Sequence, residues 1–178
     1  MLDDQSQGEV NSVSRTTSII VFALCSGIIV FGVYALFFHE LKQAQAIGIL
    51  TYGSIGFAGL ETVMCLIIPQ VLARSGRKLM ATGSLKYQGS EGPTVHTDAG
   101  KLARVYQQTT IIGCALLEGA AFFALIAYMI EGHLAALIAA VVMLIGVALH
   151  MPLGDRLSSW VENQLQIIDE EKRFSSLK

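Results

Sequence analysis

The sequence predicts an all-α, polytopic membrane protein with four transmembrane helices in two hairpins, followed by a cytoplasmic amphipathic helix at the C-terminus. Hydrophobic residues make up 53% of the 178 residues and charged residues only 15%, whereas soluble domains carry about 25% charged residues. Four apolar runs are each about as long as a helix that crosses a hydrocarbon core of roughly 30 Å. The lysines and arginines lie almost entirely outside these runs.

The first hairpin is expected over residues 17–73. Residues 1–16 before it are polar and lack the basic region and cleavage site of a signal peptide, which predicts a short, mobile cytoplasmic tail. The spans are expected at about 17–38 and 46–73, joined by a polar turn over residues 39–45. The second span is longer than a bilayer requires, so it is tilted or extends beyond the membrane. Gly53, Gly56 and Gly59 share one side of it and predict close packing against another helix.

Residues 74–106 are expected to form a cytoplasmic loop, because they hold six lysines and arginines and several glycines, with a short helix over 99–106. The second hairpin is predicted over residues 107–152, with spans at about 107–130 and 134–151 around a turn at Glu131-Gly132-His133. Residues 153–178 place apolar side chains at helical spacing among charges. This pattern predicts an amphipathic helix lying on the membrane surface, on a partner, or on the protein's own loop.

The distribution of basic residues predicts the orientation. Eleven of the twelve lysines and arginines lie in the two tails and the middle loop, and Lys42 lies in a hairpin turn. Because basic residues are retained on the cytoplasmic side, both termini and the middle loop are expected in the cytoplasm of a multi-pass protein of the inner or plasma membrane.

A weak internal repeat accompanies the two hairpins. Shifted by 92 residues, the segment 17–27 lies over 109–119, with Thr, Ile, Ala, Leu and Gly matching at several positions. In this alignment Ser26 stands where Glu118 stands. A duplication would therefore carry the acid at this position in one copy only.

Two carboxylates inside apolar runs are the candidate functional residues. A charged side chain at the middle of a membrane helix costs about 2.5–3.5 kcal/mol, so Glu118 and Glu61 mark a functional site by default. Both lie at roughly 20 Å from the nearest cytoplasmic charges, Arg104 and Arg74, and are expected to be at one depth. Facing each other, they would bind or relay a proton or small cation at neutral pH. Hydroxyl groups expected to support them are those of Thr62, Ser54, Ser26 and Tyr52. In the alternative interpretation, each acid is protonated and only fixes helix packing.

Residues 115–126, read Ala-Leu-Leu-Glu-Gly-Ala-Ala-Phe-Phe-Ala-Leu-Ile, resemble the carboxylate-bearing helix of the rotary ATPase proteolipid, or c subunit. In that family an embedded acid binds the translocated proton or sodium ion, and four-span members look like two fused hairpins. The resemblance implies that Glu118 is the ion-binding carboxylate and that the side bearing Gly53, Gly56 and Gly59 packs against a helix. Four short spans enclose little volume, so a homo-oligomer or a larger membrane complex is expected.

Several function classes are not indicated. Cys25, Cys65 and Cys114 lie in apolar runs without CxxC or Cys/His spacing, which favours packing and predicts no metal and no cofactor. The four histidines are scattered, and no HExxH or GxSxG motif occurs, so no enzyme is expected. A net charge of −2 argues against nucleic-acid binding. Two interpretations stay open: a proteolipid-like subunit that binds or relays an ion, and a non-catalytic accessory or scaffold subunit.

Overall fold

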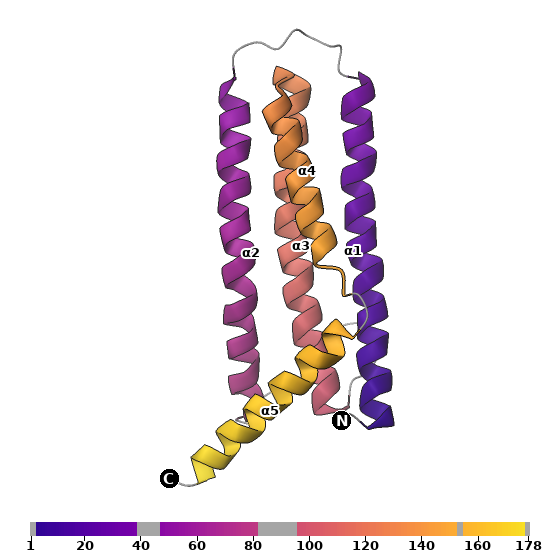
Figure 1. Ribbon diagram of the computed structural model, residues 1–178, viewed down its shortest axis with the longest axis vertical. Coiled ribbons are helices and arrows are strands. Elements are labelled where there is room, and N and C mark those ends of the chain that lie inside the picture. Colours follow the sequence, from indigo (N-terminus) through magenta and orange to yellow (C-terminus); the bar gives the residue numbers. More distant parts are fainter. Residues whose placement is uncertain (1–2, 39–46, 82–95, 153–154, 177–178) are drawn as a thin grey trace. The chain divides into compact units, whose positions relative to one another are not determined.

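The computed structural model describes residues 3–38, 47–81, 96–152 and 155–176. These residues form five helices, α1 (Asp4–Phe38), α2 (Ile49–Ala81), α3 (Asp98–Glu131), α4 (Leu134–Leu149) and α5 (Arg156–Ser176), and contain no strand (Figure 1). The all-α prediction is therefore confirmed. The turn expected over residues 39–45 and the part of the middle loop over 82–95 lie outside the described residues.

Among the described residues, three helices and not four are long and apolar enough to cross a membrane: α1, α2 and α3. The fourth apolar helix, α4, has 16 residues and is about 24 Å long, short of the roughly 30 Å of a hydrocarbon core. The expected span over 134–151 was too long because helix α4 stops at Leu149. Pro152 disfavours helical geometry at the residue before it, which accounts for the early end.

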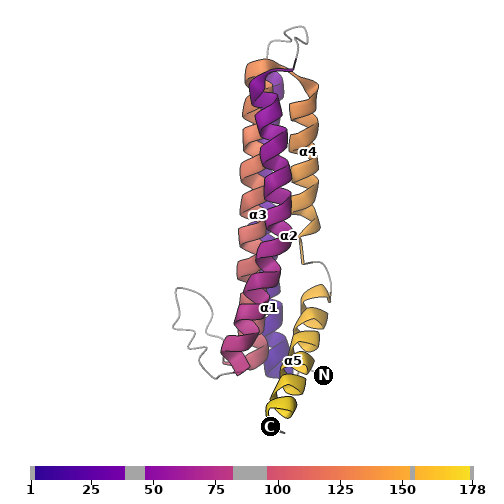
Figure 2. The same ribbon diagram turned by 90° about the vertical axis from the view of Figure 1, so that its left-hand side faces the viewer.

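The contacts divide the chain into two compact units. We call the first the apolar unit (Ile19–Ile68 and Ile111–Met151) and the second the polar unit (Met1–Ser18, Pro69–Thr110 and Pro152–Lys178). In Figures 1 and 2, the four helical segments of the apolar unit run alongside one another. Helix α3 is the central one, since half of its most apolar stretch is buried, against 17% in α1 and in α2.

Small side chains dominate the core of the apolar unit. Helix α3 contributes Ala120, Ala121 and Ala124, each 0% exposed, and α4 contributes Ala136 and Ala140. Such residues let helix backbones approach closely, and van der Waals contact between the backbones then stabilises the packing. The sequence therefore favours tight helix packing over a large-side-chain core.

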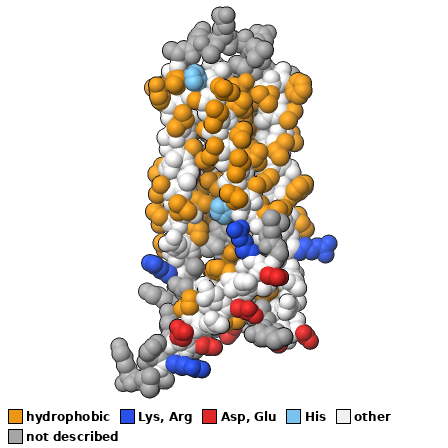
Figure 3. Space-filling view, in the orientation of Figure 1, with side chains coloured by type: hydrophobic (Ala, Val, Ile, Leu, Met, Phe, Trp, Pro, Cys, Tyr) orange, Lys and Arg blue, Asp and Glu red, His pale blue; other side chains and the backbone are white. Residues whose placement is uncertain are grey.

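The outer side of α2 is more hydrophobic than its inner side. On α2 the inward residues are Thr51, Ser54, Ala58 and Cys65, while large apolar side chains such as Leu66 point outward. Figure 3 shows hydrophobic side chains over the face of this unit that it draws. Because large exposed apolar surfaces are rare on soluble monomers, this arrangement is compatible with a lipid environment.

The polar unit contradicts the prediction of a mobile tail over residues 1–16. Helix α1 begins at Asp4, and the side chains of Val10, Val13 and Thr17 are buried. Their spacing of three and four residues places them on one side of the helix. This side packs against α3 and α5 in a second hydrophobic core, which orders the segment. The residues of this core are Val10, Val13, Ala99, Leu102, Ala103, Leu157, Val161 and Ile168.

Helix α5 is amphipathic, as expected. Leu157, Val161, Gln164 and Ile168 are buried at helical spacing, and Trp160 contacts Tyr106 of α3 with ring centroids 5.3 Å apart. Within the polar unit the apolar side of α5 thus packs on α1 and α3 of its own chain. The expected loop over 74–106 is partly helical too, since α2 continues to Ala81 and α3 begins at Asp98.

The N-terminus of α3 is capped by its own Thr97 and by Glu9 of α1. The Glu9 carboxylate accepts hydrogen bonds from the His96 amide (3.0 Å), the Thr97 amide (3.2 Å) and the Thr97 hydroxyl (2.6 Å). The Thr97 hydroxyl oxygen accepts from the Gly100 amide at 3.0 Å. Partial burial raises the pKa of Glu9, but the hydrogen bonds from Thr97 and His96 outweigh it and hold that pKa below its usual value.

Glu9→Ala is expected to destabilise the polar unit by about 0.5–1 kcal/mol at pH 7, at the low end for a cap because solvent screens the carboxylate. A carboxylate whose pKa is lowered by folding stabilises above its unfolded pKa of about 4.3 and loses this effect as the pH falls through the folded value. The difference in stability between wild type and variant should therefore shrink as the pH is lowered from 7 to 3. Thermal unfolding followed at both pH values checks this, and a difference that persists in acid would contradict the capping role.

Candidate functional site

Glu118 lies in the contact between α1 and α3. A Cβ atom added at Gly27 of α1 would meet the Oε1 atom of Glu118 at 3.4 Å, so the carboxyl group rests on the glycine backbone. The thiols of Cys25 and Cys114 lie within electrostatic range of it. Its side chain is partly exposed, and among the described residues no group donates a hydrogen bond to it.

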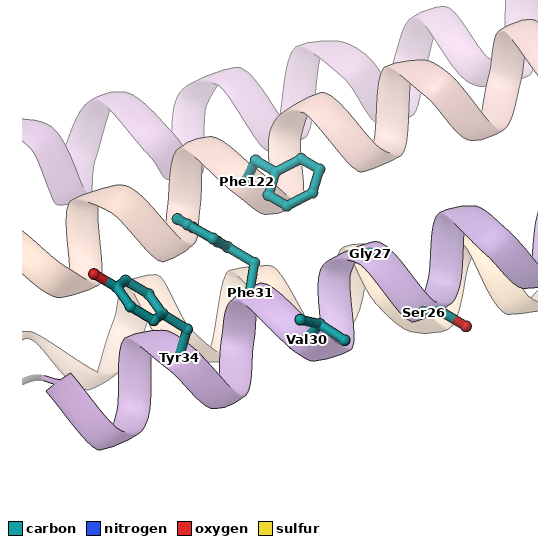
Figure 4. A pocket seen from close by; sticks show the side chains of 6 residues that line it. All are labelled: Ser26, Gly27, Val30, Phe31, Tyr34 and Phe122. Atoms are coloured by element: carbon teal, nitrogen blue, oxygen red, sulfur yellow. The ribbon is translucent and has the colours of Figure 1, made fainter.

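A groove of about 680 Å³ adjoins this position on the surface of α1 and α3. Figure 4 shows that Ser26, Gly27, Val30, Phe31 and Tyr34 line it from α1, while Phe122 closes it from α3. Phe31 and Phe122 contact edge to face, with ring centroids 5.3 Å apart. Phe122 follows Glu118 by one helical turn, so the carboxyl group lies beside the groove.

Glu61 lies on the inward side of α2. Its Oε2 atom is buried and has no hydrogen-bond partner among the described residues. Cys65, one turn further along the same helix, lies within electrostatic range of it. No hydrogen bond joins Glu61 to Glu118 in the described part of the chain, and the two acids belong to different helix contacts.

The hydroxyl groups that were expected to support the two acids make their hydrogen bonds to other groups. The side chains of Ser26, Ser54 and Thr62 donate to the carbonyl groups of Phe22, Thr51 and Ala58 in their own helices, at 2.8–2.9 Å. Hydroxyls in helices commonly satisfy themselves in this local way. Tyr52 is 63% exposed. In the described chain, the four side chains therefore do not assemble around either acid.

In the described part of the chain, Gly53, Gly56 and Gly59 make no close contact with another helix. No atom lies within 4 Å of an added Cβ at Gly56 or Gly59, and at Gly53 only Phe123 is reached, at 4.0 Å. The close helix approaches occur instead at three glycines that the sequence did not single out. An added Cβ would meet Glu118 at Gly27, Cys65 at Gly113 (3.2 Å) and Leu117 at Gly146 (3.2 Å).

A thiol–imidazole pair, Cys65 and His150, is a polar contact that the sequence did not predict. The Sγ atom of Cys65 lies 3.4 Å from Nε2 of His150, and Nδ1 of His150 lies 2.8 Å from the Gly146 carbonyl oxygen. A carbonyl can only accept, so Nδ1 carries a proton and donates it to the Gly146 carbonyl oxygen. Gly113 of α3 leaves room for the pair. The two residues are 85 positions apart, and no sequence spacing signals their contact.

No group of three or more His, Cys, Asp and Glu side chains among the described residues is arranged to hold a metal ion. Comparison of the chain with protein-family models, with curated proteins and with solved structures finds no match. The functional argument therefore rests on the chemistry of the site residues.

Glu131, which was not predicted as a site residue, caps the N-terminus of α2. At the end of α3, its Oε1 accepts from the Leu50 amide at 2.8 Å and its Oε2 from the Thr51 amide at 2.9 Å. The Thr51 side chain, together with these amides, lowers the pKa of Glu131. The N-terminus of a helix attracts negative charge, so this carboxylate caps α2 from another helix.

Gly48→Ala is expected to lower the thermal midpoint of the apolar unit by displacing the Glu131 carboxylate from α2, since an added Cβ would collide with that carboxylate. Glu131→Ala should lower the thermal midpoint by a similar amount. The double variant should be little less stable than Glu131→Ala alone, because both changes remove the same cap. Gly59→Ala, where no atom lies within 4 Å, is the matched control. Additive losses in the double variant, measured by thermal unfolding in detergent, would contradict a shared role.

Proposed function

We propose that this chain is an integral membrane subunit of an oligomeric assembly in which Glu118 binds a proton. In this proposal α1, α2 and α3 cross the bilayer, α4 forms a shorter fourth segment, and both termini lie in the cytoplasm, in line with the positions of the basic residues. The observation that carries it is the Glu118 carboxyl group, which has no hydrogen-bond donor among the described residues and lies beside an open groove.

Burial without a donor disfavours the charged form of a carboxyl group, so Glu118 in a bilayer holds a proton at neutral pH. A proton needs only this one carboxyl group. A cation such as sodium needs several oxygen ligands, and the nearby Ser26 hydroxyl is already bonded to the Phe22 carbonyl. The chemistry therefore favours a proton over a metal cation, and the resemblance to the proteolipid helix around Glu118 agrees with this choice.

An assembly is part of the proposal because one chain supplies only a single partly exposed acid in this contact. Gly53, Gly56 and Gly59 of α2 are exposed and would admit a neighbouring helix. A relay between Glu61 and Glu118 inside one chain is not part of the proposal, because the two acids lie in different helix contacts.

A second candidate is a non-catalytic accessory or scaffold subunit in which the carboxyl groups only fix helix packing. The placement of the Glu118 carboxyl group directly over the Gly27 backbone favours it, because a protonated acid at a close helix contact is a packing element. The two candidate functions differ in whether the proton on Glu118 exchanges with the surroundings.

Carbodiimide labelling in membranes, read by mass spectrometry at Glu118 with Glu61 as internal comparison, tests the proposal. We expect Glu118 to be modified at neutral pH, less so as the pH is raised, and without protection by sodium, because only an accessible protonated carboxyl group reacts. If sodium protected Glu118 from labelling, the bound species would be a cation and not a proton. No labelling at any pH would mean a sealed carboxyl group and would favour the accessory subunit.

The Glu118→Gln variant provides the functional arm. An amide resembles the protonated acid in shape but cannot exchange a proton. Proton binding therefore predicts that Glu118→Gln loses proton-dependent activity of reconstituted vesicles while its thermal midpoint is retained. A scaffold role predicts that Glu118→Gln leaves every readout unchanged and that only Glu118→Ala, which also removes packing, destabilises the apolar unit.

A further inference from the structure

We infer that the groove between α1 and α3, with Glu118 beside it, binds a lipophilic organic cation in exchange for the proton on Glu118. The ion meant here carries a single positive charge that is shielded by aryl or alkyl groups, as in a quaternary ammonium or phosphonium ion. This inference names the substrate class of the same site, so it rests on the proposed proton binding.

The groove has the size and the lining of a ligand site. Its volume is about 680 Å³, and pockets for drug-sized molecules have roughly 300–1,000 Å³ and are mostly apolar and aromatic. Three aromatic side chains form a row along it (Figure 4). Tyr34 stacks on Phe31 with ring centroids 6.1 Å apart, and Phe31 meets Phe122 edge to face at 5.3 Å. Val30, which also lines the groove, is 69% exposed, so an apolar molecule dissolved in a surrounding bilayer can reach it.

The carboxyl group of Glu118 selects the charge of the occupant. Gly27 lines the groove, and an added Cβ there would lie 3.4 Å from the Glu118 Oε1 atom and 3.8 Å from the Phe122 ring. The acid and the aromatic row therefore border the same space. A carboxylate attracts positive charge, and the face of an aromatic ring does so for a cation within about 6 Å of its centroid. Both groups disfavour an anion.

A shielded organic cation suits this lining better than a metal ion does. A metal ion needs several oxygen ligands, whereas rings and aliphatic carbon make up most of the groove, and the Ser26 hydroxyl donates to the Phe22 carbonyl. An organic cation brings its own apolar shell, which packs against the rings. One carboxylate paired with one monovalent cation is also electrically neutral, as a site of low dielectric constant favours.

Binding of the cation releases the proton. The O–H bond of protonated Glu118 breaks, the proton leaves to solvent, and the carboxylate that remains pairs with the cation, so the site is neutral before and after. The ionisable side chains that face Glu118 from α1 and α3 are the thiols of Cys25 and Cys114, and thiols are uncharged at neutral pH. Because proton and cation compete for one carboxylate, affinity for the cation rises with pH.

The test uses the full chain in detergent and measures binding of tetraphenylphosphonium by equilibrium dialysis. We expect saturable binding that tightens by up to about 10-fold per pH unit while Glu118 is protonated, because one proton leaves for each ion bound. In weakly buffered solution this proton should be detected directly. Tetraphenylborate, which has a similar shape and the opposite charge, is the ligand control and should show no saturable binding.

Variants of the acid and of one ring locate the site. Glu118→Gln cannot form a carboxylate and should abolish saturable binding. Phe122→Leu should weaken it roughly 2-fold to 30-fold, which is the range for loss of a cation–ring contact. Phe57→Leu is the matched control, because it removes a ring of another edge-to-face pair, formed with Phe123, in the same unit but outside the groove. It should leave binding unchanged.

Four results would overturn the cation site: no saturable binding at any pH, equal binding of tetraphenylborate, binding without proton release, or full affinity in folded Glu118→Gln. A groove covered by a helix of a second copy would give the first of them. Circular dichroism shows whether each variant is folded, and proton release by the wild type decides the matter if Glu118→Gln unfolds.

Carbodiimide labelling separates this inference from the proposed function. If Glu118 is labelled at neutral pH but the chain binds no tetraphenylphosphonium, only the cation site is overturned. If Glu118 is not labelled at any pH, the proton binding on which the exchange rests is overturned as well.

Discussion

Gly113→Leu is expected to lower the free energy of unfolding of the apolar unit by about 1–3 kcal/mol or more. Gly113 is buried on the central helix α3, and even one added carbon would approach the Cys65 Sγ atom to 3.2 Å and the His150 ring to 3.8 Å. Both neighbours have short side chains, so they cannot move away without displacing α2 or α4. Leucine adds three more carbons to this contact. Unfolding by SDS in mixed micelles, followed by helicity, measures the loss.

Gly119→Leu is the matched control for this experiment. It makes the same substitution in the same helix, six residues away, where the glycine is exposed and no atom lies within 4 Å of an added Cβ. Leucine also has the higher helix propensity, so the change should be neutral within about 0.5 kcal/mol or slightly stabilising. Equal losses at the two positions would show that Gly113 is not a close helix contact.

Leu102→Ala is expected to destabilise the polar unit by about 2–5 kcal/mol, because it leaves a cavity where the surrounding helices cannot fully collapse. Leu102 is 1% exposed and belongs to the core in which α1, α3 and α5 meet. Loss of this packing should also release α5, whose apolar residues Leu157 and Val161 belong to the same core. Hydrogen exchange of α5 amides, read by mass spectrometry, should therefore accelerate.

Val71→Ala is the control for Leu102→Ala. Val71 lies in the same unit and is 54% exposed, so removing two methyl groups should change the stability by no more than about 0.5 kcal/mol. Unchanged exchange of α5 in Leu102→Ala would mean that this helix is held in place by other contacts, and the polar unit would then not be one cooperative core.

Hydrophobic patterning was enough to predict most of the helices. The apolar runs of α1, α2 and α3 and the spacing of Leu157, Val161 and Ile168 each predict the helix that the structure contains. Hydrophobic patterning failed where contacts between residues distant in sequence determine whether a segment is ordered or where a helix ends. Residues from Asp4 onward are polar overall, yet Val10 and Val13 are enough to order them against α3 and α5. The early end of α4 depends on the backbone around Pro152 and not on hydrophobicity.

The candidate site was predictable only in part. The two carboxylates within apolar runs can be recognised in the sequence, because a charge within such a run is costly. Which glycines make close contacts depends on which side of each helix faces a neighbour. Gly56 and Gly59 form a regular series and stay exposed, whereas the single Gly113 is enclosed by α2 and α4.

The amino-acid sequence by itself determined the helical class, the apolar character of the spans and the presence of Glu61 and Glu118 within them, because these follow from composition and from local periodicity. Only the tertiary structure decided that the two acids occupy different helix contacts, that Cys65 meets His150, and that Glu131 caps α2. Each of these contacts joins residues from different helices. Their formation depends on the rotation of each helix about its axis, which is set by the packing of small side chains across the whole unit.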